Sequence, residues 1–341
     1  MAAHYMQKSP LDNWIKSKIV QDDLAKWQLE HLRDTLFLVN ERSPFYKKRL
    51  QGYPIDLSSI QELENLPFTT PEDIRNEALR MVCVSQDEIQ RVVTLQTSGT
   101  TGDPKRLFFT AEDQDLTIDF FGIGMSTLTK PGERVLIFLP WEAPNSVGDL
   151  LRKGLIKAGR IPIPYGPIKD PMNAIHTMQA EKADCLVGSP TQILGLALRW
   201  KPNLVPPKTV LLSTDHVPNS IKAKLESTWG CEVFNHYGAT EMGLGGGVEC
   251  EAHEGLHLRE ADLFFEIVDP NTGKSLPDGE YGEVVFSTLT RKGMPLVRYR
   301  TGDESRLIPG TCKCGSNFRR LEIVRGRFSG YYQIGDNILK M

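Results

Sequence analysis

Thr97-Ser98-Gly99-Thr100-Thr101-Gly102-Asp103-Pro104-Lys105 combines four hydroxyl side chains, two glycines and a lysine in nine residues. Glycines let backbone N–H groups approach a polyanion closely, hydroxyls donate to phosphate oxygens, and the lysine supplies a positive charge. The segment is not a P-loop of the strand–loop–helix kind, because Pro104 stands where the second glycine of G-x-x-x-x-G-K would be. Strand-like runs at 91–95 and 106–109 flank it. We therefore expect a phosphate-holding loop of a β-hairpin, with a plain Gly/Thr/Ser turn as the alternative.

The composition of the chain is that of a globular protein and excludes several classes. Of its 341 residues, 40% are hydrophobic and 24% are charged. A net charge of −3 argues against a nucleic-acid-binding protein, which normally carries a basic face. No apolar run approaches the ~18 residues of a membrane span, and residues 1–8 lack the apolar core of a secretory signal. We expect a cytoplasmic protein with no membrane or nucleic-acid partner, whose six cysteines are reduced or bind a metal.

Three regions follow one another along the chain. Apolar residues recur at helical spacing from residue 11 to 50, and Thr70-Pro71 predicts the capped start of a further helix, so residues 1–90 are expected to be helical. Between 91 and 246, predicted strands alternate with helices, which indicates parallel βαβ units in a doubly wound α/β sheet. From 247 to 326, short β segments with turn signals predict a smaller antiparallel subdomain.

Polar stretches follow several strands of the predicted α/β core. They comprise residues 139–142, 213–216 and 235–241. Ligands of doubly wound sheets bind in the crevice beyond the carboxyl ends of the strands. The sequence therefore predicts a ligand site where these three stretches meet.

Three motifs in order carry a family resemblance: TSGTTGDPK (97–105), HYGATE (236–241) and YRTGD (299–303), followed by Gly326-Arg327. Together they resemble the adenylate-forming superfamily of acyl-CoA synthetases, adenylation domains and luciferases. The chain is most similar to the phenylacetate-CoA ligase branch, on residues 43–46, 66–70, 255–257, 277–283 and 294–301. The resemblance runs from about residue 10 to 327. It implies the large N-terminal domain of these enzymes, with mixed or parallel sheets and flanking helices.

The resemblance implies a two-step reaction. A carboxylate attacks the α-phosphate of ATP to give an acyl-adenylate and pyrophosphate, and a thiol such as CoA then takes the acyl group. Such chemistry needs charge neutralisation and in-line positioning more than covalent help. The implied catalytic residues are Lys105 and Glu241, the latter binding Mg²⁺, and Thr240 on the α-phosphate. The remaining nucleotide contacts that the resemblance implies are Thr97, Ser98, Gly99, Thr100, Thr101 and Gly102 on the phosphates, Tyr237 with Gly238 against adenine, and Asp303 and Arg327 on the ribose.

Other implied positions depart from the family pattern or lack a motif. Asp215 occupies the place of a glutamate beside adenine, within Ser213-Thr214-Asp215 where the family has Gly-Ala-Glu. Trp141, Gly243 and Gly245 are candidates for the acyl pocket, in which the glycines would leave room for a bulky flat acid. A packed core aromatic is the alternative for Trp141. The family branch suggests an aryl or arylacetic acid, but the sequence does not identify the acid.

Cysteine and histidine residues in the predicted β subdomain indicate a metal site. Cys312-x-Cys314 follows a turn, and Cys250, His253 and His257 lie about sixty residues earlier. Thiolates and imidazole in a tetrahedral set suit Zn²⁺. The resemblance favours Cys250, His257, Cys312 and Cys314 as ligands of a structural zinc, and His253 stays open as the alternative histidine. Four reduced residues without a metal are the other interpretation.

Relatives continue about a hundred residues beyond the Gly-Arg motif as a small mobile domain. Here residues 327–341 would be a hinge or a remnant of it, so the chain is either a naturally short enzyme or a truncated ligase, and slow adenylation with poor CoA transfer is expected. Alternatives to a CoA ligase are transfer to a carrier protein or partner enzyme, or a non-catalytic nucleotide- or acid-binding relative. The expected ligands are ATP or AMP, Mg²⁺, CoA, zinc and a carboxylic acid, and a homodimer stays open.

Overall fold

A computed structural model of the chain describes residues 9–19, 23–95, 104–328, 331–334 and 337–340. The N-terminal region is helical, as predicted. Its elements are α1 (Pro10–Lys18), α2 (Leu24–Arg42), α3 (Pro44–Arg49), the 3-10 turn η2 (Ile60–Asn65), α4 (Pro71–Glu77), η3 (Ala78–Met81) and η4 (Gln86–Glu88). Thr70 caps the start of α4. Its hydroxyl accepts a hydrogen bond from the backbone N–H of Asp73, and the side-chain carboxylate of Asp73 accepts one from the backbone N–H of Thr70.

A parallel sheet forms the core of the α/β part, again as predicted. Its strands and helices alternate as β3 (Arg134–Ile137), α6 (Val147–Lys157), β4 (Ile161–Pro164), α7 (Pro171–Ala180), β5 (Cys185–Gly188), α8 (Pro190–Ala197), β6 (Thr209–Leu212), α9 (Asn219–Trp229) and β7 (Glu232–Tyr237). The strands lie side by side in the order β4-β3-β5-β6-β7, all parallel. The chain therefore winds outward in both directions from β3 and β5, which makes the sheet doubly wound.

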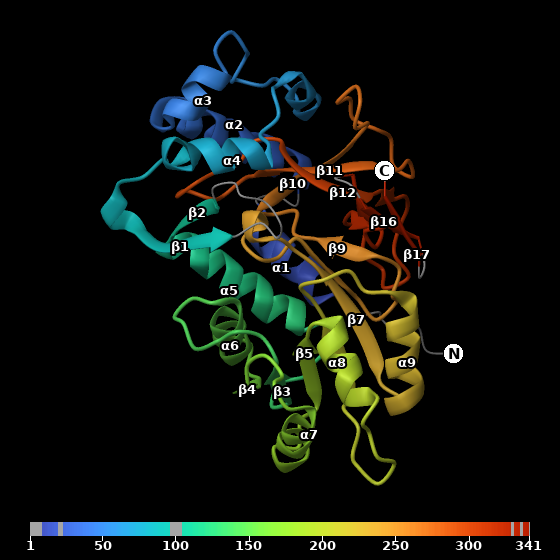
Figure 1. Ribbon diagram of the computed structural model, residues 1–341. Helices are drawn as coiled ribbons and strands as arrows, with labels where there is room; N and C mark the ends of the chain where they lie inside the picture. The colour runs from blue at the N-terminus through green and yellow to red at the C-terminus, as the bar shows by residue number, and fades with distance from the viewer. Residues whose placement is uncertain (1–8, 20–22, 96–103, 329–330, 335–336, 341) are drawn as a thin grey trace.

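Successive residues of β3 show how both faces of this sheet are covered. Val135 and Ile137 pack with α5 (Ala111–Met125), α6 and α1, whereas Leu136 packs with α7, α8 and α9. Figure 1 shows these two helix layers in the lower half of the molecule. No helix in the described ranges is long and apolar enough to cross a membrane.

The second half of the chain divides between two sheets, which differs from the predicted separate subdomain beginning at residue 247. Strands β8 (Gly247–Glu249), β9 (Leu256–Leu258), β13 (Leu307–Ile308) and β14 (Arg320–Leu321) extend the parallel sheet antiparallel to β7, giving the order β13-β14-β9-β8-β7-β6-β5-β3-β4. Another sheet has the order β10-β11-β12-β15-β16-β17. Its strands are β10 (Leu263–Val268), β11 (Gly282–Thr288), β12 (Tyr299–Ser305), β15 (Gly326–Arg327), β16 (Tyr331–Ile334) and β17 (Asn337–Lys340).

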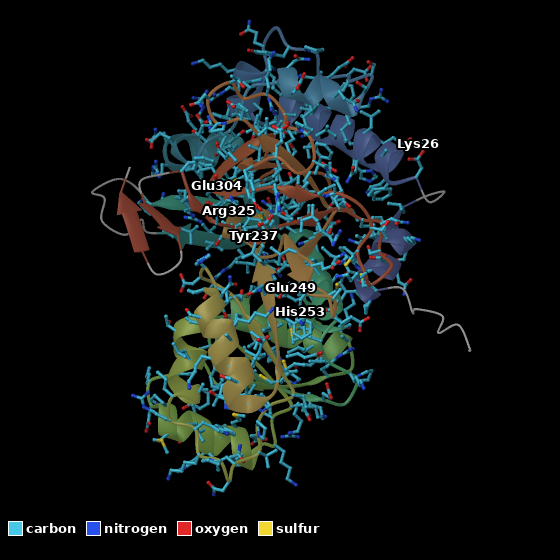
Figure 2. The ribbon with its side chains drawn as sticks, turned by 90° about the vertical axis from the view of Figure 1, so that its right-hand side faces the viewer. Lys26, Tyr237, Glu249, His253, Glu304 and Arg325 are labelled. Carbon is cyan, nitrogen blue, oxygen red and sulfur yellow. The ribbon has the colours of Figure 1, made fainter. Side chains whose placement is uncertain are left out.

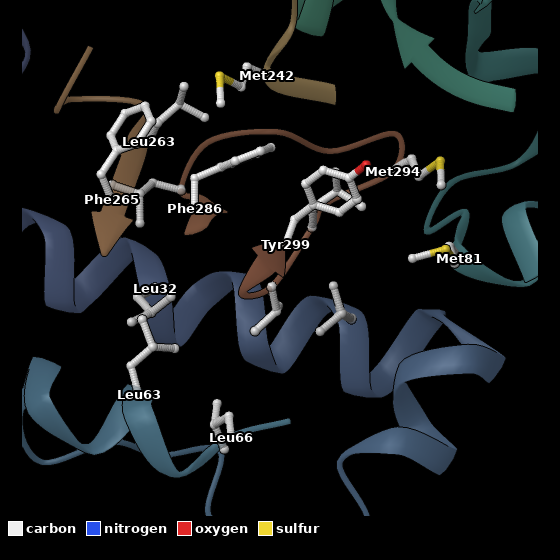
Figure 3. Packing of buried hydrophobic residues seen from close by; sticks show 14 of the residues in the cluster. Leu32, Leu63, Leu66, Met81, Met242, Leu263, Phe265, Phe286, Met294 and Tyr299 are labelled. Atoms are coloured by element: carbon white, nitrogen blue, oxygen red, sulfur yellow. The ribbon is translucent and has the colours of Figure 1, made fainter. Parts of the chain in front are cut away.

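The largest hydrophobic cluster joins this second sheet to the N-terminal helices. Leu32 of α2 and Phe265, Phe286 and Tyr299 of the sheet are all buried in it (Figure 3). Met242, which belongs to the short turn η5 (Thr240–Met242) after β7, has no exposed surface in the same cluster. The loop after β7 is therefore anchored between the two sheets, and this position is where the candidate site lies.

Candidate active site

Glu241 lies at the centre of the site, on η5. Its carboxylate accepts a hydrogen bond from the ammonium of Lys105, the first residue of β2 (Lys105–Thr110), and another of 3.0 Å from the hydroxyl of Tyr299. Arg291 donates to the backbone carbonyl of Glu241 at 2.6 Å. Three segments far apart in the chain thus fix one buried acidic residue.

The electrostatics keep Glu241 ionised. Burial alone would raise the pKa of its carboxyl, but the charge and hydrogen bond of Lys105, together with the Tyr299 hydroxyl, hold that pKa below its usual value. A buried carboxylate with a lysine and a phenol on one oxygen is a hard anionic group that suits a divalent cation beside phosphates.

A second group of side chains lies along β12. Tyr237, the last residue of β7, donates its hydroxyl to Asp303 at 2.8 Å, and Arg327 donates its Nε to the other carboxylate oxygen, also at 2.8 Å. Asp303 and Arg327 are paired residues of β12 and β15. Burial and the neighbouring carboxylate raise the pKa of Tyr237 well above its usual value, so the phenol stays protonated. Figure 2 shows Tyr237 near the middle of the molecule, close to the labelled Glu304 and Arg325.

The start of β12 is held by Arg298, which is 1% exposed and has a φ of 46°. Its guanidinium donates to the buried carboxylate of Glu266 at 2.9 and 3.2 Å. It also donates to the carbonyls of Glu64, Leu66 and Gly273. Because β12 carries both Tyr299 and Asp303, this anchor holds in place the strand that contributes to both halves of the site.

Several other predicted residues can now be located. The β1 (Ile89–Leu95) and β2 strands form the expected antiparallel hairpin, with Leu95 opposite Lys105. The predicted phosphate contacts Thr97, Ser98, Gly99, Thr100, Thr101 and Gly102 lie outside the described residues. A Cβ on Gly238 would lie 2.4 Å from the carbonyl oxygen of Leu244, so this glycine permits a tight backbone approach after Tyr237. Thr240 begins η5, and Asp215 is exposed in the loop after β6.

An apolar cavity lies between α5 and the parallel strands, next to this site. Its space between atoms, including the part open to solvent, is about 430 Å³. It is lined by Phe120, Phe121, Gly124, Met125, Leu139, Val147, Leu151, Val187, Leu211, Ser213, His236, Leu244 and Val248. An apolar lining with few polar groups is a feature of many small-molecule sites.

The predicted acyl-pocket residues Trp141, Gly243 and Gly245 are not among the residues that line this cavity, and their assignment to an acyl pocket stays a prediction. Trp141 is half-buried in the loop after β3, beside Gly166. Gly245 does not leave open room, because a Cβ there would lie 2.3 Å from the ring of Phe120. Gly243 has a φ of 72°, and a Cβ there would meet Arg291 and Thr117. Both glycines therefore permit close packing of their neighbours.

Sequence reasoning missed two functional candidates inside the quoted motifs, His236 and Tyr299. Each is the first residue of its motif, and neither was given a role there. The alternation of side chains along a strand could have identified His236, because it must face opposite to Tyr237. Ser213 was named only as part of the stretch beside adenine, yet its hydroxyl lies 3.0 Å from Nδ1 of His236.

The four predicted metal ligands meet in one place. The thiols of Cys250, Cys312 and Cys314 and one ring nitrogen of His257 all lie within 4.8 Å of one another, and all four residues are buried. His253 does not belong to this group. Its Nδ1 lies 3.4 Å from Glu249 and 3.3 Å from Lys222. Figure 2 shows His253 next to Glu249. The structure therefore selects His257 between the two histidines that the sequence left open.

Comparisons with known proteins give consistent results. Residues 25–290 match the family described as AMP-binding enzyme. The chain is 31% identical to the phenylacetate-coenzyme A ligase of Aromatoleum evansii over 333 residues, covering 94% of this chain and 74% of that protein. It is 30% identical to the phenylacetate-coenzyme A ligase of Pseudomonas putida, covering 90% of this chain and 71% of that protein.

Solved structures show the same fold. A 2-hydroxyisobutyryl-CoA ligase in complex with an acyl-adenylate and CoA superposes with a TM-score of 0.83 at 21% identity, covering 94% of this chain and 72% of that one. The structure of the same ligase in the postadenylation state gives a TM-score of 0.82 at 20% identity.

Proposed function

Since the chain belongs to the AMP-binding enzyme family, we propose that it is an AMP-forming ligase that activates a carboxylic acid with ATP and transfers the acyl group to CoA. The observation that carries this proposal is the presence of two hydrogen-bonded clusters near the ends of β7 and β12. The first consists of Lys105, Glu241 and Tyr299. The second consists of Tyr237, Asp303 and Arg327. One cluster suits phosphates and a cation, and the other suits a nucleoside.

In the adenylation step a carboxylate oxygen of the acid forms a bond to the α-phosphorus of ATP, and the bond from that phosphorus to pyrophosphate breaks. Lys105 supplies the cation that neutralises charge on the phosphates, and Thr240 contacts the α-phosphate. Asp303 accepts from the ribose hydroxyls with Arg327 beside it, and the ring of Tyr237 lies against adenine with Gly238 allowing the approach. Asp215 is a further adenine contact, and Thr97, Ser98, Gly99, Thr100, Thr101 and Gly102 bind the departing pyrophosphate.

Glu241 fits the magnesium ion that such a reaction uses. Both donors from neighbouring side chains go to its Oε1, so among the described residues Oε2 receives no side-chain hydrogen bond. A buried, ionised carboxylate whose second oxygen accepts from no described side chain is the ligand type that Mg²⁺ takes beside phosphates. The ion, when bound, neutralises charge on the phosphates, and Tyr299 keeps the carboxylate oriented.

The apolar cavity is the proposed acyl site. It opens beside His236 and Leu244, which lie immediately before Tyr237 and shortly after Glu241 in the chain. An apolar lining next to the adenylate suits an aryl or arylacetic acid. The similarity to phenylacetate-coenzyme A ligases supports the same class of acid, because phenylacetate is an arylacetic acid.

A structural zinc is proposed for Cys250, His257, Cys312 and Cys314. Three thiols and an imidazole within 4.8 Å of one another, all on buried residues, have the number and kind of donors that a structural Zn²⁺ site uses. All six cysteines are free of disulfides, which supports a reducing compartment, and we place the protein in the cytoplasm.

Acid-dependent exchange of pyrophosphate into ATP tests the function at its first step. Wild-type protein should exchange with at least one acid of an aryl and alkyl panel, and Lys105→Ala should lower the rate about 10²–10³-fold, as loss of one charge-stabilising donor does. Arg106→Ala is the matched control, because Arg106 is adjacent but exposed. No exchange by wild type with any acid would favour a non-catalytic nucleotide- or acid-binding protein. Exchange without thioester formation from CoA would favour a carrier protein or partner enzyme as acyl acceptor.

A further inference from the structure

Two polar side chains interrupt the apolar lining of the acyl cavity. Of the described residues that line it, only Ser213 and His236 carry polar groups. His236 and Tyr237 are consecutive on β7, so they point to opposite faces. Tyr237 faces Asp303 on the nucleotide side, and His236 faces the cavity and the rings of Phe120 and Phe121, with centroids 6.2 Å away in both cases.

Ser213 fixes the His236 ring and leaves one nitrogen without a partner. Its hydroxyl lies 3.0 Å from Nδ1. The Nε2 atom is buried and has no hydrogen-bond partner within the described part of the chain. Burial lowers the pKa of His236 to about 4, so the ring is neutral near pH 7 and Nε2 is either a donor or an acceptor, according to the tautomer.

A buried nitrogen without a partner is costly. Its free-energy cost corresponds to a factor of about ten to a hundred in the equilibrium constant for folding or binding. An apolar residue at the same place would carry no such cost. A ligand group that pairs with Nε2 recovers that factor. A hydroxyl suits either tautomer, because it both donates and accepts.

We propose that His236, oriented by Ser213, is a specificity-determining residue that binds a hydroxyl group on the acyl part of the substrate. The preferred acid is then a hydroxyl-bearing carboxylic acid whose acyl group is otherwise apolar. This inference rests on the proposed function for the place of the acyl group. A wholly apolar acid would leave Nε2 unpaired, and discrimination against it follows from the same cost.

Matched acids test the proposal without any substitution. Phenylacetate is compared with its α-, 2-, 3- and 4-hydroxy derivatives, and butyrate with 3-hydroxybutyrate, by pyrophosphate exchange and by calorimetric binding in the presence of AMP. One hydroxylated acid should exceed its parent by at least about tenfold in kcat/KM and in affinity. Parents that bind and react as well as every hydroxylated derivative would overturn the proposal.

Variants then assign the preference to His236. His236→Leu should bring the ratio of hydroxylated to parent acid close to one, and His236→Gln, which retains a polar group near Nε2, should keep part of it. Met125→Leu, an apolar lining change, should alter both acids alike. A ratio that survives His236→Leu in folded protein overturns the proposal. Selective binding without exchange would instead refute the adenylation function and retain the role of His236.

Discussion

Replacing Arg298 with methionine should destabilise the protein strongly, because the side chain is the buried anchor of β12. The substitution removes both hydrogen bonds to Glu266 and the bonds to the carbonyls of Glu64, Leu66 and Gly273. Glu266 would keep a side-chain partner only in Ser275, at 3.3 Å, among the described residues. Removing one member of a buried ion pair costs about 3–5 kcal/mol. We expect a loss of that size in the free energy of unfolding at pH 7.

The pH dependence of this loss has a definite sign. Burial already raises the pKa of Glu266 despite Arg298, and losing Arg298 raises it further. A carboxyl whose folded pKa is raised is destabilising above its unfolded pKa, near 4.3, and not below it. The deficit of Arg298→Met should therefore shrink as the pH falls from 7 toward about 4.5.

Urea denaturation of a double-variant cycle measures the effect. Arg298→Met with Glu266→Met should be at least about 2 kcal/mol more stable than the sum of the two single losses predicts, because no buried charge is left unpaired. Arg75→Met is the control, since Arg75 pairs with an exposed glutamate on α4 and should cost about 0.5 kcal/mol or less. A loss below about 1 kcal/mol for Arg298→Met, or additive losses in the cycle, would refute this reasoning.

Three further predictions concern the metal cluster, the cavity wall and His236. Elemental analysis should find one zinc per chain in the wild type, because four buried donors meet in the cluster. The zinc content should be near zero in Cys314→Ser and unchanged in Cys83→Ser, whose thiol lies outside the cluster. A folded wild-type protein without metal would contradict this prediction. Gly245→Ala should cost about 1–3 kcal/mol in thermal or urea unfolding, because its Cβ would lie 2.3 Å from Phe120, whereas Gly195→Ala on α8 has open space and should not destabilise. Between about pH 6.5 and 4 the free energy of unfolding should fall by up to about 3 kcal/mol through His236, since the unfolded histidine binds a proton there and the buried one does not. That part of the slope should be missing in His236→Gln, and an unchanged slope would show that burial does not lower the pKa of His236.

Much of the fold could be predicted from local patterns. Helical periodicity with Thr70 as cap located α4, and the alternation of strands and helices predicted the doubly wound sheet. The extent of that sheet could not be predicted, because β8 and β9 pair antiparallel with β7 through contacts that a periodicity does not encode. The boundary at residue 247 was predicted because alternating strands and helices give way there to short β segments with turn signals. In the structure the hydrogen bonds between β7 and β8 cross this boundary. The division into domains otherwise stays a prediction.

The space around the glycines after the HYGATE motif could not be predicted. Glycines near a motif suggested open space, but a missing side chain leaves room only if no neighbour fills it, and Phe120 fills the place beside Gly245. His236 was overlooked because a histidine inside an apolar strand has no role until its surroundings are known. The carboxyl ends of β6 and β7, where Ser213 and His236 lie, were nevertheless the predicted place of the site.

The sequence by itself determined the motifs, their order and the residue types that suit phosphates, ribose and zinc, because these depend on short stretches of chain. Only the tertiary structure decided that Lys105 meets Glu241 across 136 positions, that Tyr299 shares the same carboxylate, and that His257 rather than His253 joins the cysteines. Such contacts result from the packing of distant segments around a common core. Their distances are set by sheet register and side-chain volume, which no local spacing specifies.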